Sequence, residues 1–316
     1  MESLKDLQNP SPEYSSSSTL LSFLDKDVTR LIPRPLPGTK QIPVSYNGAQ
    51  PNTKSLINRL KVNKGGKMVE HLTIYTQNIW FSPSDQEERF GEIVKFIEEF
   101  LPDFVCLQEC IAQFTALLLK SEKIVRTYHI SQNSGNWYTV QILSKWPCHI
   151  TKLSFSPHTM MARSLLLAST VINRTPVTVS TTHFESSDGK EGYTARCKQM
   201  EIAFSALKEH ENVLIMGDFN YDAVRGKEEE ARDKSFVDLF DCKSGTTLDF
   251  TYIPRRDRLD RMLLKGRDWE ATGHYFLVGT EPIPKYSGMS IYEGNIVRSL
   301  SDHLGIISVI KFKGTI

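Results

Sequence analysis

The chain lacks the features that identify membrane, secreted and strongly basic proteins. Its apolar runs, such as SLLLASTVI, are far shorter than the roughly 20 residues that a membrane-spanning helix needs, so we expect no membrane segment. The N-terminus MESLKDLQNPSPEYSSSS has no basic stretch followed by an apolar core, so we expect no secretory signal. A net charge of +1 gives no overall basic footprint for nucleic acid, which leaves only a local basic groove as a way to bind it.

Cysteines are few and form no recognisable disulfide or zinc pattern. The chain has five, an odd number at scattered positions, which is typical of reduced thiols in an intracellular protein. Cys106 and Cys110 are spaced like half of a zinc site, but no second pair or histidine cluster supplies the four ligands that zinc requires. We therefore expect an intracellular protein without a zinc site.

Proline is unevenly distributed, and this divides the chain near residue 67. Seven of the 15 prolines lie in the first 51 residues, together with a serine run at residues 15–18. Such a segment buries too little apolar surface to offset the entropy of ordering it. The sequence therefore predicts a disordered Pro- and Ser-rich tail over residues 1–67 and one folded domain over residues 68–316.

After residue 67, strand-like runs alternate irregularly with a few helical patterns. HLTIYTQNI predicts a strand, whereas DQEERFGEIVKFIEEFLP has apolar residues at helical spacing and ends at a proline. Further helices are predicted over residues 111–121 and 191–210. Further strands are predicted over residues 103–109, 137–144, 148–155, 164–172, 176–184, 213–220, 258–265, 269–278 and 304–312. This pattern favours an α+β protein in which two sheets pack face to face with helices outside.

Polar side chains follow the predicted strands at the points where the strands end. In VLIMGDFN, Asp218 and Asn220 are two positions apart and face the same way if the strand continues. Each such residue also has an ordinary explanation, because Asp and Asn are common in turns and helix caps and a lone histidine is usually structural. The full set is Asn78, Glu109, His183, Asp218, Asn220, Asp260, Asp302 and His303. Together they offer oxygen ligands for a hard cation, a base for water and donors for developing negative charge, which phosphoryl chemistry needs.

Four short motifs in fixed order resemble the endonuclease/exonuclease/phosphatase superfamily over roughly residues 70–312. They are TQN at 76–78, LQE at 107–109, GDFN at 217–220 and SDH at 301–303. The segment TTHFESSDGKEGYTARCKQM, together with MMARSLLLASTVI and RLDRMLL, is similar to the 5′-tyrosyl-DNA phosphodiesterase branch. The resemblance implies a four-layer α/β/β/α sandwich of two mostly antiparallel sheets with outer helices, and it makes residues 68–316 the catalytic domain.

The resemblance also implies a metal site. Glu109 would hold Mg²⁺, for which Mn²⁺ can substitute, and Asp302 would support the metal or its water shell. Asn78 would help to position the metal or the phosphate. Zinc should substitute poorly, because the implied ligands are hard oxygens.

The remaining motif residues take catalytic roles by the same resemblance. Asp218 would orient and deprotonate the attacking water. Asn220 and His303 would stabilise the pentacovalent phosphate, with His303 donating as a cation. His183 would contact the phosphate from the opposite sheet, and Asp260 would brace a catalytic histidine.

The implied substrate is DNA with a 5′ protein or tyrosyl adduct. The predicted substrate-binding residues are Glu185, Ser186, Arg163 and Trp80. The resemblance thus implies an Mg²⁺-dependent phosphodiesterase of DNA repair that leaves a 5′-phosphate and acts as a monomer in the nucleus, with the cytoplasm as the alternative. An RNA exonuclease, a deadenylase or another phosphoesterase of the superfamily is the alternative activity. A catalytically inactive scaffold that binds nucleic acid is the alternative of a different class.

Overall fold

The described part of the chain belongs to one unit, Pro35–Ile316, of the computed structural model. It comprises residues 40–42, 44–46, 68–132, 138–241, 249–280, 290–292, 295–297 and 299–314. The predicted tail over residues 1–67 lies outside the described residues except for two short strands, β1 (Lys40–Ile42) and β2 (Val44–Tyr46), so its disorder stays a prediction. Cys242 also lies outside them.

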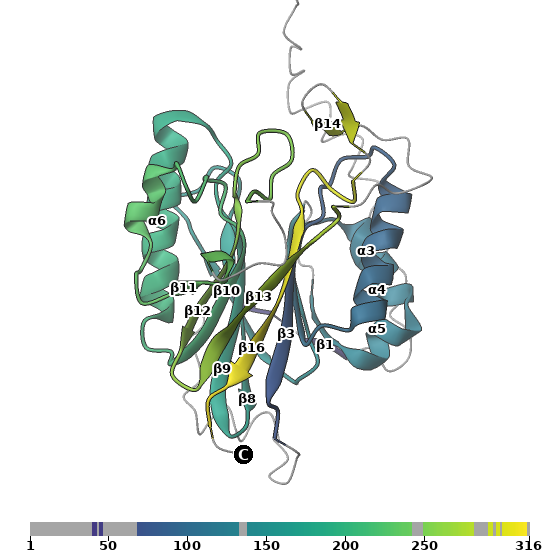
Figure 1. Ribbon diagram of the computed structural model, residues 1–316, viewed down its shortest axis with the longest axis vertical. Helices are drawn as coiled ribbons and strands as arrows, with labels where there is room; N and C mark the ends of the chain where they lie inside the picture. Colours follow the sequence, from purple (N-terminus) through teal and green to yellow (C-terminus); the bar gives the residue numbers. More distant parts are fainter. Residues whose placement is uncertain are drawn as a thin grey trace, which may run out of the picture. The chain divides into compact units, whose positions relative to one another are not determined.

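Two sheets lie face to face between two layers of helices (Figure 1). One sheet is covered by α6 (Gly189–Leu207). The other is covered by α3 (Gln86–Phe100), α4 (Ala112–Lys120) and α5 (Glu122–Thr127). Two short 3₁₀ helices complete the described helical elements, η2 (Lys227–Ala231) and η3 (Leu239–Asp241). The expected α/β/β/α sandwich is confirmed.

Each sheet has seven strands, one of which is β1 or β2. The first sheet has the order β1, β5 (His129–Ser131), β6 (Thr139–Ser144), β4 (Phe104–Cys110), β3 (His71–Asn78), β16 (Gly305–Phe312) and β13 (Trp269–Val278). The second has the order β11 (Val237–Asp238), β12 (Asp260–Gly266), β10 (Asn212–Asp218), β9 (Thr175–His183), β8 (Ser164–Ile172), β7 (His149–Ser154) and β2. A separate hairpin pairs β14 (Ser290–Tyr292) with β15 (Asn295–Val297). The sheets are mixed: most pairs are antiparallel, but β3 with β4, β9 with β10, β1 with β5 and β2 with β7 are parallel.

Helix α3 shows how the sequence sets these elements. Its apolar residues Phe90, Ile93 and Ile97 recur at helical spacing and are buried against the first sheet. Leu101 takes a left-handed backbone conformation with a φ of 45°, and a proline follows, so the helix ends there. The predicted range of residues 85–102 is slightly longer than the observed helix at both ends.

Strand β8 separates two apolar cores. Leu166 and Ala168 point into the core between the sheets, whereas Leu165 and Leu167 point outward and pack under α6. The strand therefore reads as a continuous apolar run, as expected for one buried on both faces. In the part of the chain that the structure describes, no helix is long and apolar enough to cross a membrane.

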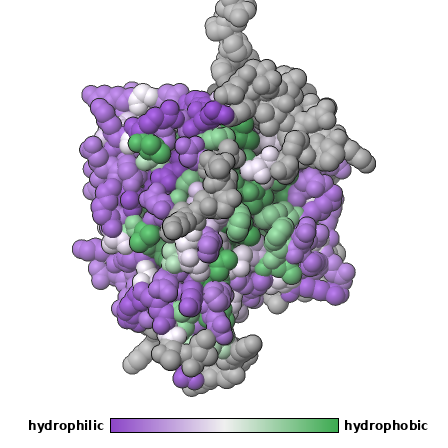
Figure 2. Space-filling view, in the orientation of Figure 1, coloured by the Kyte–Doolittle hydropathy of each residue, from purple (hydrophilic) through white to green (hydrophobic). Residues whose placement is uncertain are grey.

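The outer face of the first sheet carries an apolar groove beside α3 (Figure 2). The groove has a volume of about 830 Å³. Its apolar lining comes from α3, β13 and β16 and includes Phe96, Phe100, Phe276, Val278, Ile307 and Val309. Phe100 is 55% exposed and lies at the C-terminal end of α3, away from the strand ends that carry the sequence motifs.

Two parallel crossovers bring the ends of four strands to one edge of the sandwich. Strand β3 leads through α3 into the parallel β4, which places Asn78 beside the end of β4, where Glu109 lies. Strand β9 leads through α6 into the parallel β10, which places His183 opposite Asp218. The antiparallel β12 begins at this edge with Asp260 opposite Asp218. Because parallel strands end on the same side of a sheet, the motif residues of both sheets meet there.

Candidate active site

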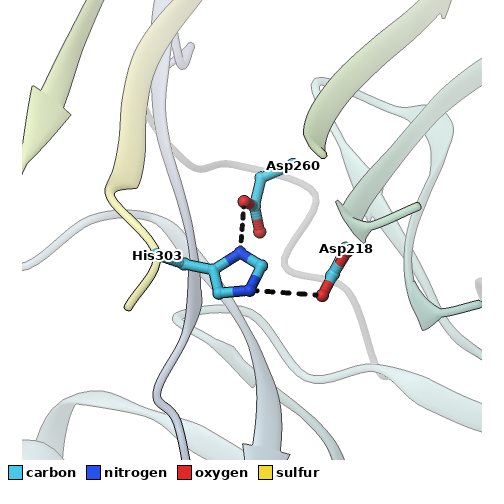
Figure 3. Close-up of side chains that lie close together, drawn as sticks. All are labelled: Asp218, Asp260 and His303. Atoms are coloured by element: carbon cyan, nitrogen blue, oxygen red, sulfur yellow. Dashed lines mark hydrogen bonds and ion pairs between the residues drawn. The ribbon is translucent and has the colours of Figure 1, made fainter. Parts of the chain in front are cut away.

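His303 lies between two carboxylates at this edge (Figure 3). Its Nδ1 is 2.7 Å from Asp260 Oδ2, and its Nε2 is 3.7 Å from Asp218 Oδ2. Asp218 and Asp260 come from neighbouring strands of the second sheet, whereas His303 precedes β16 of the first. All three side chains are buried. The two sheets therefore meet at one network of interacting charged side chains.

The surroundings of the site favour opposite charges on His303 and Asp218. Burial alone would lower the pKa of His303, but the carboxylates of Asp260 and Asp218 outweigh it and hold the pKa well above its usual value. Burial alone would raise the pKa of Asp218, but His303 and His183 outweigh it and bring the pKa below its usual value. At neutral pH His303 is therefore a cation and Asp218 an anion.

His183 is buried beside the same carboxylate but is neutral. Its Nδ1 is 2.9 Å from Arg163 Nη1, and because a guanidinium can only donate, Nδ1 accepts and Nε2 carries the proton. Burial, reinforced by the charge of Arg163, lowers the pKa of His183 to about 3. Its Nε2 is 3.3 Å from Asp218 Oδ2. One neutral and one cationic N–H donor therefore face this carboxylate.

Asn78 links the two sheets at the centre of the site. Its Nδ2 donates to Asp218 Oδ2 at 3.0 Å and to Glu109 Oε1 at 3.3 Å. Its Oδ1 accepts the backbone N–H of Trp80 at 3.0 Å, which fixes the orientation of the carboxamide. Asn78 thus holds one carboxylate from each sheet in a fixed relation.

Glu109 projects from an irregularity in β4. Its backbone φ is 60°, and the pairing of β4 with β6 shifts register between Leu107 and Cys110. A bulge of this kind re-aims a side chain relative to the alternating pattern of the strand. Glu109 Oε2 accepts the backbone N–H of Phe81 at 3.0 Å. Burial raises the pKa of Glu109 to about 7, although the Phe81 amide offsets part of the effect.

Two groups of side chains could hold a divalent cation. One comprises Asp218, Asp260 and His303, whose ligand atoms lie within 4.8 Å of one another. A protonated His303 has no lone pair to offer, so this group is better suited to moving a proton. The other is built on Glu109, whose pKa is raised further by the charges of Asp302 and Asp218. This excess of buried negative charge, carried by hard oxygen atoms, fits Mg²⁺ or Mn²⁺.

Asp302 and Trp80 lie next to the central groups. Asp302 is partly buried, and burial raises its pKa, although the charge of His303 offsets part of the effect. Trp80 follows the motif asparagine in a left-handed conformation with a φ of 56°, and the guanidinium of Arg89 lies 4.7 Å from its ring. A metal contact for Asp302 and a substrate contact for Trp80 stay predictions.

Arg163, Glu185 and Ser186 lie on the same side of the site as the neutral histidine. Glu185 is fully buried, and its carboxylate accepts a hydrogen bond from Gln199 Nε2 at 3.1 Å. It therefore braces the protein segment around it. Ser186 is exposed, and Arg163 Nη2 donates to its Oγ at 3.4 Å. Substrate contacts for all three stay predictions.

Asn220 lies beyond the end of its strand. Strand β10 ends at Asp218, and Asn220 has a left-handed φ of 52°, so the extended conformation that would align the two side chains does not persist. The backbone N–H of Asn220 donates to Asp218 Oδ1 at 2.8 Å, and its Nδ2 donates to the carbonyl of Phe184 at 2.9 Å. The structure shows Asn220 supporting Asp218 through its backbone. Its contact with phosphate stays a prediction.

Four residues of the site were given no function from the sequence: Gln77, Arg89, Phe81 and Tyr138. Gln77 Nε2 donates to the carbonyl of His303 at 2.9 Å and so ties β3 to the histidine. Arg89 donates to the carbonyl of Ile79 and so fixes the loop after β3. The rings of Phe81 and Tyr138 stack on each other at the opening of the site. Only Arg89 gives a sequence signal, because it is a charged residue on the apolar stripe of its helix.

Known proteins resemble this chain in sequence. A sequence profile described as the Endonuclease/Exonuclease/phosphatase family matches residues 75–303. Tyrosyl-DNA phosphodiesterase 2 from Xenopus tropicalis is 28% identical over 156 residues, which are 48% of this chain and 41% of the relative. The match thus spans less than half the length of that relative.

Two solved structures share the fold. A D. rerio TDP2 complexed with single strand DNA product is 22% identical, with a TM-score of 0.62 over 76% of this chain and 99% of that chain. Sphingomyelinase C from Streptomyces griseocarneus is 19% identical, with a TM-score of 0.61 over 76% of this chain and 99% of that chain. Identities this low establish a common architecture.

Proposed function

The chain belongs to the endonuclease/exonuclease/phosphatase family, whose profile matches residues 75–303, and we propose that it is a metal-dependent phosphodiesterase of nucleic acid. The proposed substrate is a 5′-phosphotyrosyl DNA end, from which water releases tyrosine and leaves a 5′-phosphate. Such an enzyme would act in DNA repair, as a monomer in the nucleus.

The separation of charge around Asp218 is the observation that carries the proposal. The ionised Asp218 can orient a water molecule and accept its proton as the water attacks phosphorus. The cationic His303 and the neutral His183 can both donate to phosphate oxygens, where negative charge develops. Asp260 accepts from Nδ1 of His303, so the second ring N–H faces Asp218, where it could donate to a phosphate oxygen of the substrate.

Glu109 is the residue best placed to hold the cation. Its partly buried carboxylate has a pKa of about 7, so a divalent ion competes with a proton for it at neutral pH. When bound, such an ion would act as a Lewis acid on the phosphate. Asn78 keeps the Glu109 carboxylate in a fixed relation to Asp218.

Nucleic acid as the substrate is supported by the relatives and by one surface beside the site. The name of one relative refers to tyrosyl-DNA, and one structure of the same fold holds a single strand DNA product. The ring of Tyr252 lies 4.9 Å from that of His303, and the guanidinium of Arg255 lies 5.3 Å from Tyr252. The side chain of Arg255 is exposed, and its Nε also pairs with Asp257 at 2.8 Å. Arg258 and Arg261 of the same stretch are buried in ion pairs and serve the fold.

A substrate panel tests the proposal. Initial rates are compared at equal concentrations of a 5′-tyrosyl oligonucleotide, an abasic duplex, a polyadenylate strand and an inositol polyphosphate, each with Mg²⁺ and with EDTA. Asp218→Asn is the matched control for contaminating activity and should lose about 10²- to 10⁴-fold in rate. Preference for the tyrosyl end supports the proposal. Preference for polyadenylate would assign the protein to RNA processing, and preference for the inositol compound would show that nucleic acid is not its substrate.

A further inference from the structure

Two stacked aromatic rings lie at the opening of the site. The ring centroids of Phe81 and Tyr138 are 4.8 Å apart, and the rings are nearly parallel, at 8°. Phe81 belongs to the loop after β3, and Tyr138 comes just before β6. Phe81 is 44% exposed, so its side of the stack is accessible. We propose, building on the proposed function, that this pair is a platform on which a nucleobase of the bound strand stacks.

Both rings of the platform are tied to catalytic groups. The backbone N–H of Phe81 donates to Glu109 Oε2 at 3.0 Å. The Tyr138 ring lies 5.9 Å from the ring of His183, and the guanidinium of Arg163 lies 5.2 Å from the Tyr138 centroid. A nucleotide whose phosphate reaches the histidines therefore brings its own base, or that of the next nucleotide, to the platform.

Exposed apolar side chains gather around the same opening. Met160 and Met161 are 62% and 40% exposed, and Met161 lines a small cavity together with Tyr138 and His183. The catalytic aspartates and histidines are buried. An apolar rim around a charged centre suits a ligand that joins a charged phosphate to a flat, uncharged ring.

A nucleobase is the ring that best meets these conditions. Nucleic-acid substrates, DNA or RNA, carry a base close to the phosphate that is cleaved, whereas only the 5′-tyrosyl end carries a phenol. Stacking on aromatic side chains accepts any base, because each base has a π face. The platform therefore selects single-stranded ends, whose bases are free to stack, without selecting a sequence.

The test measures coupling between the Phe81 ring and one base. The probe is a fluorescent, 5′-phosphorylated single strand of roughly eight nucleotides, within the site sizes known for such proteins. Its affinity is measured by fluorescence anisotropy for the wild-type chain and for Phe81→Ala, Phe81→Leu and Phe81→Trp. The titration is repeated with an abasic unit at each of the first three positions in turn. Phe100→Ala removes an exposed ring far from the site and is the control.

Phe81→Ala should weaken binding of the intact strand about 5- to 150-fold, the loss expected for one stacked base. Phe81→Leu should weaken it also, whereas Phe81→Trp and Phe100→Ala should bind like the wild type. With the abasic unit at one position, the loss in Phe81→Ala should disappear, because the two partners are coupled.

An equal loss on every abasic strand, or no loss on the intact strand, would overturn the platform. A loss confined to the rate of cleavage of the tyrosyl substrate would show that the ring contacts the leaving group, and this also overturns it. If the wild-type chain bound none of these strands, the proposed function would fail and the platform with it. Thermal unfolding of each variant checks that the chain remains folded.

Discussion

The two buried histidines of the site differ in charge because their nearest partners differ. His303 is hydrogen-bonded to the carboxylate of Asp260, whereas His183 is hydrogen-bonded to the guanidinium of Arg163. Burial acts on both rings in the same direction, yet the two pKa values move apart. Titratable groups separated in this way are typical of sites that transfer protons.

Asp260→Asn should lower kcat about 10²- to 10⁴-fold. It should also move the alkaline limb of the pH–rate profile to lower pH. His303 donates as a cation only while protonated, so activity is lost as the pH rises through its raised pKa. Removing the Asp260 charge lowers that pKa, and the loss then begins sooner. Steady-state rates measured across neutral and alkaline pH test this.

Asp241→Asn is the control for this profile. Asp241 is an exposed carboxylate paired with Arg258, away from the histidines, and its replacement should leave the alkaline limb in place. An alkaline limb that does not move in Asp260→Asn would show that His303 does not act as the cationic donor.

Glu109 should make metal affinity depend on pH. Its pKa of about 7 means that a proton and a divalent ion compete for the carboxylate. The dissociation constant for Mn²⁺ should therefore fall as the pH rises toward 7, by up to about tenfold per pH unit, and level off above it. Calorimetric titration with Mn²⁺ at several pH values measures this. Glu109→Gln has no proton to lose, so it should bind Mn²⁺ weakly at every pH, and a pH-dependent affinity in this variant would place the ion elsewhere.

The sequence predicts the identities of the central residues better than their contacts. Asn78, Glu109, His183 and Asp218 lie together because the parallel crossovers bring strand ends to one edge, and the sequence predicted each of these residues at the end of a strand. The contacts of Asn220 could not be predicted, because its left-handed φ of 52° breaks the strand pattern on which the prediction relied.

Long elements with clear periodicity are the ones that the sequence predicts. The helices α3 and α6 and most strands of both sheets lie within a few residues of their predicted ranges. Helix α5 and the strands β5 and β11 were not predicted, because 6, 3 and 2 residues are too few to show a period. Their positions are set by contacts with the rest of the fold.

The loop between β3 and α3 depends on one buried arginine. Arg89 Nη1 donates to the carbonyl of Ile79 at 2.9 Å and to that of Trp80 at 3.1 Å. Its other nitrogens donate to the carbonyls of Ser82 and Ser84 at 2.6 Å and 2.9 Å. This loop includes the Phe81 amide that binds Glu109. We therefore expect Arg89 to position the carboxylate of Glu109, the proposed metal ligand.

Arg89→Lys should weaken Mn²⁺ binding about 10- to 100-fold, the range typical of residues that orient a metal ligand. A lysine ammonium cannot reproduce the fork of donors that holds these carbonyls. Calorimetry gives the affinity, and Arg126→Lys, in an exposed ion pair on α5, is the control and should bind normally. Unchanged Mn²⁺ affinity together with a lower melting temperature would assign Arg89 a purely structural role.

At the scale of the whole molecule, every proposed catalytic residue lies between Asn78 and His303. A chain that begins at Met68 should therefore fold and hydrolyse bis-p-nitrophenyl phosphate. It would lose β1 and β2, two strands of three residues at sheet edges, so we expect its melting temperature to fall by roughly 2–8 °C. Circular dichroism and the rate of nitrophenol release measure both properties.

A chain that begins at Leu36 is the comparison for this truncation. It keeps both short strands, so a difference between the two chains reports on residues 36–67, the segment that carries β1 and β2. If the chain from Met68 were unfolded while the chain from Leu36 were stable, the segment 36–67, which carries the short strands, would be essential to the sandwich.

The apolar layer between the sheets also sets the distance between the groups of the candidate active site that the two sheets carry. Glu109 is carried by one sheet and Asp218 by the other, and side chains such as Ile74 and Leu214 fill the space between the sheets behind them. Packed interiors transmit small changes in volume rather than absorbing them. Exchanges among aliphatic residues in this layer would thus change the gap between Glu109 and Asp218, which the phosphate of the proposed substrate would bridge. Evolution could retune such an enzyme toward longer or shorter phosphoesters from within its core, with every catalytic residue left in place.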